Sequence, residues 1–274
     1  MASPSAWAAA GITKGFRIVD VMRASLKVSV FPLVGLLACA LILGAQSSKQ
    51  DAAKAPSAPA SPHDLSGVWT MHAPPSARSY IGDTFTKDEP AMTPWGEEQY
   101  KATKPSNGPR THTLDTTDDP VLRSCLPPGV PRIYLQPFPL QIVQTPNEVI
   151  ILYEYDHSVR HIYTDLQKHP DDLTPTYMGH SIGHWEGDKL VVDTTGFNDS
   201  TWLDRTGHRH SDQLHVVERL QRTDRDTLQV DISMDDSKAL AKPWVSQLVF
   251  QLKPDWKIME QNCADNGSFA NFEK

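Results

Sequence analysis

Short apolar runs that alternate with polar residues, and that are closely spaced by turn residues, constrain this chain most. Glu148–Tyr155 and Lys189–Thr195 are two such runs, and they are entered through Pro146-Asn147 and Glu186-Gly187-Asp188. Alternation with a period of two is typical of half-buried strands, and connectors of two or three residues are typical of hairpins. Because helical periodicity is nearly absent here, we predict an antiparallel meander.

The predicted strands are numerous enough to close a sheet. They are Gly67–Met71, Leu140–Thr145, Glu148–Tyr155, Val159–Asp165, His180–Trp185, Lys189–Thr195, Gln213–Thr223, Thr227–Met234, Val245–Leu252 and Lys257–Cys263. A closed barrel removes exposed strand edges, which otherwise promote aggregation. We therefore predict an all-β fold, a barrel of about 8–10 strands.

The region before the main run of strands has a different pattern. Thr93, followed by Pro94 and early acidic residues, forms an N-cap signal, and we predict one short helix that ends near Lys104. Residues 105–139 are rich in Pro, Asp and Thr and are expected to form a long ordered loop.

The first 45 residues carry the features of an export signal. Basic residues precede the apolar run Val28–Leu43, which ends at Gly44-Ala45. The run is shorter than the about 20 residues of a membrane span, so cleavage after Ala45 is expected. An uncleaved anchor and lipidation of Cys39, in the lipobox-like Leu36–Cys39, are the alternatives. Residues 46–63 are rich in Ala, Pro and Ser and indicate a disordered linker before a domain at 64–274.

Charge and cysteine content limit the partners and the compartment. The net charge of −7 repels a phosphate backbone, so we expect no nucleic-acid partner, and contact with a membrane only through the N-terminal segment. We expect a periplasmic or secreted protein, with anchoring to the envelope as the alternative. In such an oxidising compartment Cys125 and Cys263 are expected to form a disulfide, the alternative being two buried thiols.

Two stretches resemble known families. Leu65-Ser66-Gly67-Val68-Trp69 resembles the Gly-x-Trp opening of lipocalin-type (calycin) barrels, which implies a barrel whose closed end is covered by Trp69. The stretch 181–199, SIGHWEGDKLVVDTTGFND, followed by HSDQLHVVER at 210–219, is similar to a family of exported proteins from environmental bacteria. That second resemblance spans about residues 64–265 and implies no activity.

Histidine is the unusual residue of this chain, because eleven are present. On one strand, His208 and His210 share a face with Cα atoms about 7 Å apart, which allows chelation, and His215 can supply a third ligand. His180 and His184 are too far apart to share a metal, at about 13 Å along a regular strand. The sequence thus predicts a divalent metal site at His208, His210 and His215, or histidines of a polar surface loop.

A second set of residues predicts acid–base chemistry without a metal. His161, Tyr163, Asp193, His215 and Glu218 lie on predicted strands among apolar residues. Ionisable groups are rarely buried without partners, so such residues indicate either a polar lumen or an outward ion-paired face. A histidine paired with a carboxylate suits proton transfer near neutral pH. The residues expected to bind substrate are Tyr155, Arg160, His180, His184 and Trp185.

Three functions are compatible with this pattern. The leading hypothesis is a small-molecule lyase, isomerase or hydrolase that uses these groups without an organic cofactor. The alternative is a carrier that binds a small, largely apolar organic ligand in a barrel pocket. A filled barrel with no cavity would instead indicate an envelope interaction module. The enzyme is favoured if four side chains converge in one cavity, those of His161, Asp193, His215 and Glu218. An apolar lumen with these groups outside favours the carrier.

Overall fold

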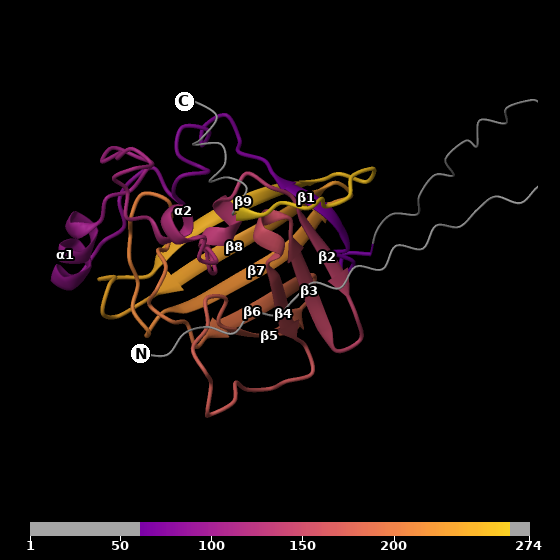
Figure 1. The fold of residues 1–274 in the computed structure, drawn as a ribbon. Helices are drawn as coiled ribbons and strands as arrows, with labels where there is room; N and C mark the ends of the chain where they lie inside the picture. The colour runs from indigo at the N-terminus through magenta and orange to yellow at the C-terminus, as the bar shows by residue number, and fades with distance from the viewer. Residues whose placement is uncertain (1–60, 264–274) are drawn as a thin grey trace, which may run out of the picture. The chain divides into compact units, whose positions relative to one another are not determined.

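The computed structural model describes residues 61–263, so the predicted export signal at 1–45 and most of the predicted linker at 46–63 lie outside the described residues. Nine strands in this part pair in chain order, and β1 also pairs with β9, which closes the sheet into a barrel (Figure 1). The strands are β1 Gly67–Met71, β2 Leu140–Gln144, β3 Glu148–Tyr153, β4 Val159–Tyr163, β5 His180–Glu186, β6 Lys189–Thr195, β7 His215–Asp224, β8 Thr227–Asp235 and β9 Trp244–Leu252. The predicted all-β barrel is confirmed.

One of the predicted strands is wrong. Residues 257–263 contain no strand, because β1 occupies the edge of β9 through the pairing of Trp69 with Leu252, and a closed sheet has no free edge to extend. The segment is held instead by side chains: Met259 N–H donates to Glu154 Oε2 at 2.8 Å, and Cys263 N–H donates to Asp156 Oδ1 at 3.2 Å.

The prediction of a fully antiparallel sheet is wrong at one pair of strands. β4 and β5 run parallel, and their ladder pairs Ile162 with Ser181 and Tyr163 with Ile182. A parallel pair needs a long crossover, and residues 164–179 supply it as a loop that extends beyond the sheet at the bottom of Figure 1. We call the junction of β4, β5 and this loop the parallel seam.

Helices are few and short in the described residues. They are α1 Pro94–Ala102, α2 Pro120–Ser124, and the single 3-10 turns η1 Arg132–Leu135 and η2 Tyr155–His157. The predicted cap of α1 is confirmed, since Gly96 N–H donates to Thr93 Oγ1 at 3.0 Å. α2 and η1 lie within the segment predicted as a long loop. No helix within residues 61–263 has the length and apolar character needed to cross a bilayer.

The barrel lumen is filled by side chains from alternate positions of the strands. Buried inward residues include Trp69, Ile142, Ile151, Ile162, Val192, Leu220, Val230, Leu248 and Phe250. Tyr134 of η1 packs edge-on against Tyr153 and Phe250, so the turn closes over the same core. The lumen is therefore a packed core.

The predicted disulfide is present. Cys125, at the C-terminal end of α2, is bonded to Cys263 with their Cα atoms 5.6 Å apart. Structural disulfides form in oxidising compartments, so the bond indicates a location outside the reducing cytoplasm.

Candidate functional site

The barrel wall divides the predicted acid–base residues into two groups. Arg160 and Glu218 point into the lumen and are buried, whereas His161, Asp193 and His215 lie at positions of the opposite parity and are partly exposed. Neighbouring positions on a strand face opposite sides of the sheet, so the two groups are separated by the backbone itself. Glu218 therefore does not join His215 in one cavity.

Arg160 and Glu218 form a fully hydrogen-bonded ion pair inside the barrel. Arg160 Nη1 donates to Glu218 Oε1 at 3.0 Å, and its other nitrogens donate to Glu218 Oε2, to Ser181 and to Thr194. Tyr134 Oη donates to Glu218 Oε1 at 2.8 Å. Burial raises the pKa of Tyr134 well above its usual value, so the hydroxyl stays protonated. A buried pair satisfied in this way supports the core, and its removal from one side only is costly.

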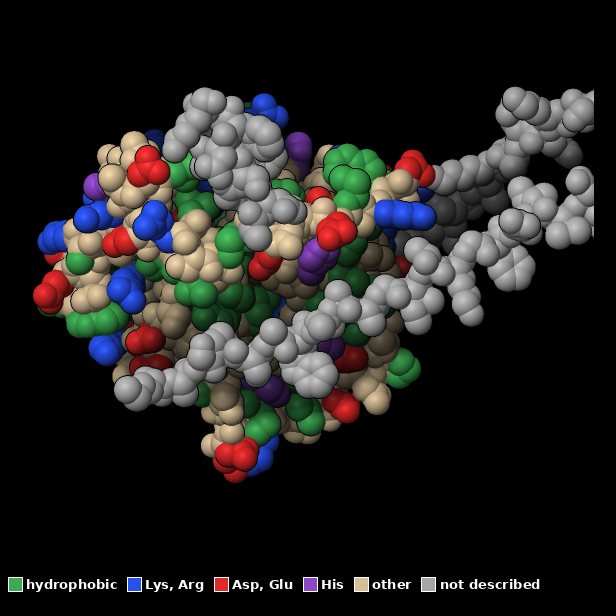
Figure 2. All heavy atoms as spheres, viewed as in Figure 1, with side chains coloured by type: hydrophobic (Ala, Val, Ile, Leu, Met, Phe, Trp, Pro, Cys, Tyr) green, Lys and Arg blue, Asp and Glu red, His purple; other side chains and the backbone are tan. Residues whose placement is uncertain are grey.

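A group of imidazoles surrounds Asp193 on the outer face of the barrel. Asp193 Oδ2 lies 2.8 Å from His215 Nε2, and Asp193 Oδ1 lies 2.9 Å from His169 Nε2. His169 Nδ1 is 2.9 Å from His180 Nδ1, and the ring of Tyr163 stacks on His180 with centroids 5.3 Å apart. We call His169, His180, Asp193 and His215 the imidazole cluster. Figure 2 shows histidine side chains at the surface near the strands that Figure 1 labels β4 to β6.

The imidazole cluster brings together three residues that the sequence singled out and one that it missed. Asp193, His215 and His180 are predicted site residues, whereas His169 lies in the crossover loop, and only the local excess of histidines pointed to it. Both the carboxylate and the rings remain accessible, since the exposed fraction of the side chain is 18% for His169 and 38% for Asp193.

The surroundings of Asp193 and His180 shift the pKa values of both groups. Burial raises the pKa of Asp193, but hydrogen bonds from His169 and His215 outweigh it, so the pKa is lowered and the carboxylate is charged. Burial and repulsion by His169 lower the pKa of His180, which favours the neutral ring. Because a carboxylate only accepts, His169 and His215 each direct an Nε2–H at Asp193, and a neutral ring in this orientation carries its lone pair on Nδ1.

The remaining predicted residues lie outside this cluster. His161 pairs with Glu148 at 2.9 Å, and His184 pairs with Glu186 at 2.9 Å, both at the surface. Trp185 stacks on His63 with ring centroids 4.3 Å apart. Tyr155 is buried in η2. The structure does not bring these four residues to one place.

The three histidines of the predicted metal site are also separated. His210 hydrogen-bonds Thr201 and the Ser211 carbonyl, His215 belongs to the imidazole cluster, and His208 has carboxylate partners of its own. Across residues 61–263, no group of three His, Cys, Asp or Glu side chains is arranged to hold a metal ion. The spacing argument fails because residues 208–210 belong to a loop in which the two imidazoles have different partners.

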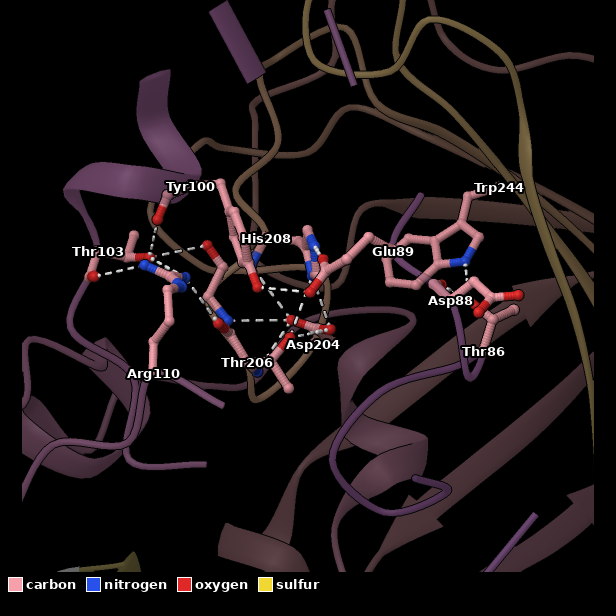
Figure 3. A network of polar contacts seen from close by, with 11 residues as sticks. Thr86, Asp88, Glu89, Tyr100, Thr103, Arg110, Asp204, Thr206, His208 and Trp244 are labelled. Carbon is pink, nitrogen blue, oxygen red and sulfur yellow. Dashed lines mark hydrogen bonds and ion pairs between the residues drawn. The ribbon is translucent and has the colours of Figure 1, made fainter. Parts of the chain in front are cut away.

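His208 is buried and lies between two carboxylates, the buried Asp204 and the half-exposed Glu89 (Figure 3). Its Nδ1–H donates to Asp204 Oδ2 at 2.8 Å, and its Nε2–H donates to Glu89. Burial lowers the pKa of His208, but the charge of Asp204 and the hydrogen bonds raise it to about 9. Burial also opposes the charge of Asp204, yet His208 lowers its pKa to about 2. The network is thus an imidazolium clamped by two anions.

The His208 network joins segments that are far apart in the chain. Tyr100 of α1 stacks on the His208 ring with centroids 4.3 Å apart and donates its hydroxyl to Glu89 at 2.7 Å. Both ring nitrogens of His208 donate hydrogen bonds to carboxylates, so the ring is a poor proton acceptor. These contacts hold together α1, the segment at 86–89 and the loop at 204–208. A polar pocket of about 220 Å³ adjoins Glu89 and His208.

A larger and more apolar pocket lies beside β1 and the end of β9. Its volume is about 470 Å³, and its apolar walls are Met71, Ala73, Ile81, Leu135, Pro137, Phe138, Pro139 and Trp256. Four polar side chains also line it, Thr70, Gln136, Arg205 and Lys253. We call this cavity the apolar pocket. Sequence analysis missed it, because its lining comes from loops whose proximity depends on barrel closure.

The sequence matches no model of a known protein family, and none of the curated proteins is similar to it. The resemblances noted in the sequence therefore stay predictions, and function has to be argued from the sites themselves.

Proposed function

We propose that this protein binds a small, largely apolar organic anion in the apolar pocket, as a carrier or binding protein. The observation that carries this proposal is the pair of cationic side chains, Arg205 and Lys253, in a pocket whose walls are mainly apolar. Gln136 lines the same pocket and is 8% exposed, and its buried Nε2 has no hydrogen-bond partner in the part of the chain that the structure describes.

The charge of the pocket favours an anion as that acceptor. Arg205 and Lys253 both line it, and Arg205 Nη1 lies 3.7 Å from Asp83, which offsets part of its charge. Burial lowers the pKa of Arg205, a direction that expresses the cost of holding this cation away from water. A ligand carboxylate or sulfonate would reduce that cost.

The size and lining of the pocket favour an apolar ligand body. A volume of about 470 Å³ lies within the range of about 300–1,000 Å³ typical of small-molecule sites. The walls combine proline, leucine, methionine and aromatic side chains with few polar groups, which is the usual composition of such sites. The ligand would lie beside the end of the barrel, because the lumen is packed.

The distribution of the acid–base residues supports the carrier over the enzyme. Glu218 lies in the packed lumen, His161 and His215 lie on the outer wall, and none of them lines the apolar pocket. Catalytic groups have to reach the proton they transfer, within about 3 Å or through one water. A ligand in the apolar pocket has no such contact with these side chains.

Competition between matched ligands tests the proposal. Displacement of the fluorescent anion anilinonaphthalene sulfonate from the full chain should be at least about tenfold more effective with decanoate than with decanol, since charge-assisted hydrogen bonds contribute about 1.5–3 kcal/mol. The variant Lys253→Met should weaken decanoate binding and lose most of that preference. Lys257→Met, outside the pocket, is the matched control. Equal displacement by the acid and the alcohol, or a control that behaves like Lys253→Met, contradicts the proposal.

A further inference from the structure

The imidazole cluster is unlike the sites of His161 and His184 because a ring nitrogen of one of its histidines contacts a ring nitrogen of another. His161 and His184, on the same outer surface, each point one nitrogen at a glutamate. His169 and His180 instead bring two Nδ1 atoms to 2.9 Å. Two ring nitrogens at this distance share one proton in a hydrogen bond. One Nδ1 therefore carries a lone pair, and the other carries the proton that it donates.

Asp193 determines which nitrogen of His169 carries the lone pair. The Nε2–H of His169 is directed at Asp193 Oδ1 at 2.9 Å, so in the neutral ring Nδ1 carries the lone pair and faces His180. A histidine that donates its other N–H to a carboxylate is the usual arrangement of a metal-binding imidazole, because the carboxylate fixes the ring and increases its basicity.

We propose that His169 and His180 bind a divalent transition metal ion, with Cu²⁺ preferred, through their two Nδ1 atoms. His180 transfers its proton from Nδ1 to Nε2 on binding, so both rings stay neutral and each contributes one lone pair. With metal–nitrogen bonds of about 2.0 Å, nitrogens 2.9 Å apart subtend about 90° at the metal. That angle belongs to neighbouring positions of a tetragonal site, the geometry of Cu²⁺ and Ni²⁺, whereas tetrahedral zinc requires about 3.3 Å.

The surroundings fit a two-imidazole site completed by water. The described residues place no third His, Cys, Asp or Glu side chain where it could join the same ion. The rings are partly exposed, so water can fill the remaining positions, and Cu²⁺ binds nitrogen sites more strongly than the other divalent first-row metals. The negative charge of Asp193, held beside His169, favours a cation here. Tyr163, stacked on His180, limits the rotation of that ring.

Calorimetric titration of the tag-free full chain with Cu²⁺ tests this proposal, together with electron paramagnetic resonance of the bound ion. We expect one equivalent to bind, with hyperfine structure from two nitrogen ligands. His180→Gln and His169→Gln should each weaken binding by at least tenfold, and Asp193→Asn by about tenfold, the lower end of the effect of such supporting carboxylates. Ni²⁺ should bind at the same site more weakly.

His184→Gln is the matched control, since His184 lies on the same strand as His180 and pairs only with Glu186. It should bind Cu²⁺ like the wild type, and circular dichroism should show all four variants folded. Absence of stoichiometric binding overturns the proposal. So does equal weakening by His184→Gln, which would mean adventitious binding to surface histidines, or unchanged binding in both His169→Gln and His180→Gln.

Discussion

His208 illustrates how much a single residue can determine in this fold. The imidazolium is 3% exposed, and both of its nitrogens are held by carboxylates. Its folded pKa of about 9 lies above the ordinary histidine pKa of about 6.5, so folding favours the protonated form. A raised pKa stabilises the folded state fully below about pH 6.5, and the contribution disappears as pH rises through about 9.

We therefore predict a pH-dependent effect of His208→Gln. The difference of about 2.5 pKa units corresponds to a loss on the order of 3 kcal/mol in the free energy of unfolding at low to neutral pH. The gap between wild type and variant should narrow as pH rises to 10, because the wild type then loses its own charge. Urea denaturation at pH 6, 8 and 10 measures this, with His184→Gln as the exposed control. A gap that stays constant with pH contradicts the assigned ion pairing.

Individual residues also show where sequence reasoning reached the candidate site and where it stopped. Asp193 and His215 lie on neighbouring antiparallel strands with outward parity, so alternation and the predicted meander place both side chains on one face of the sheet. His169 could not be placed, because the conformation of a crossover loop depends on contacts that form only after the barrel closes. Gln136 carried no sequence signal at all, since an unpaired amide is visible only in three dimensions.

The strands and hairpins were the most predictable elements. Turn pairs such as Pro146-Asn147 fixed their ends within one or two residues, because turn chemistry and alternation are local properties. The parallel seam could not be predicted in this way, because the strand that pairs with β5 depends on how the whole sheet closes. Lys257–Cys263 alternates like a strand, yet without an edge to pair with, its backbone bonds to side chains instead.

Helix α1 depends on a close approach that only glycine permits. A Cβ on Gly96 would lie 2.1 Å from the carbonyl oxygen of Ala239, a backbone atom that cannot rotate away. We predict that Gly96→Ala lowers the free energy of unfolding by about 1–3 kcal/mol through overpacking, although alanine is the better helix former by about 1 kcal/mol. Glu98→Ala, on the exposed side of the same helix, should be nearly neutral. Thermal denaturation of both variants measures this, and equal stability contradicts the close contact.

The whole molecule is tied together by the disulfide more than by any helix. Cys125 and Cys263 are 138 residues apart, so the bond encloses eight of the nine strands within one covalent loop. Such a loop restricts the unfolded chain, and its loss typically costs about 2–5 kcal/mol.

We predict that the double variant Cys125→Ser/Cys263→Ser keeps its β-sheet circular dichroism but unfolds at a lower temperature. The reason is that the barrel core does not contain the bond, whereas the entropy of the unfolded chain depends on it. Wild-type protein with reductant should shift to the stability of the variant, and the variant itself should not respond to reductant. A reductant effect of equal size in both proteins would mean that another group is responsible.

The odd number of strands explains why the barrel contains a long crossover loop. A ring in which every neighbour runs in the opposite direction needs an even count, and the described barrel has nine strands. A closed ring of nine strands must therefore contain a parallel pair, and that pair is β4 and β5. Hairpin loops are tied in length to the register of their strands, but the crossover that parity demands is free of that restriction. Its length and residues can vary without disturbing the barrel, which makes the loop carrying His169 the part of the wall most open to acquiring new chemistry.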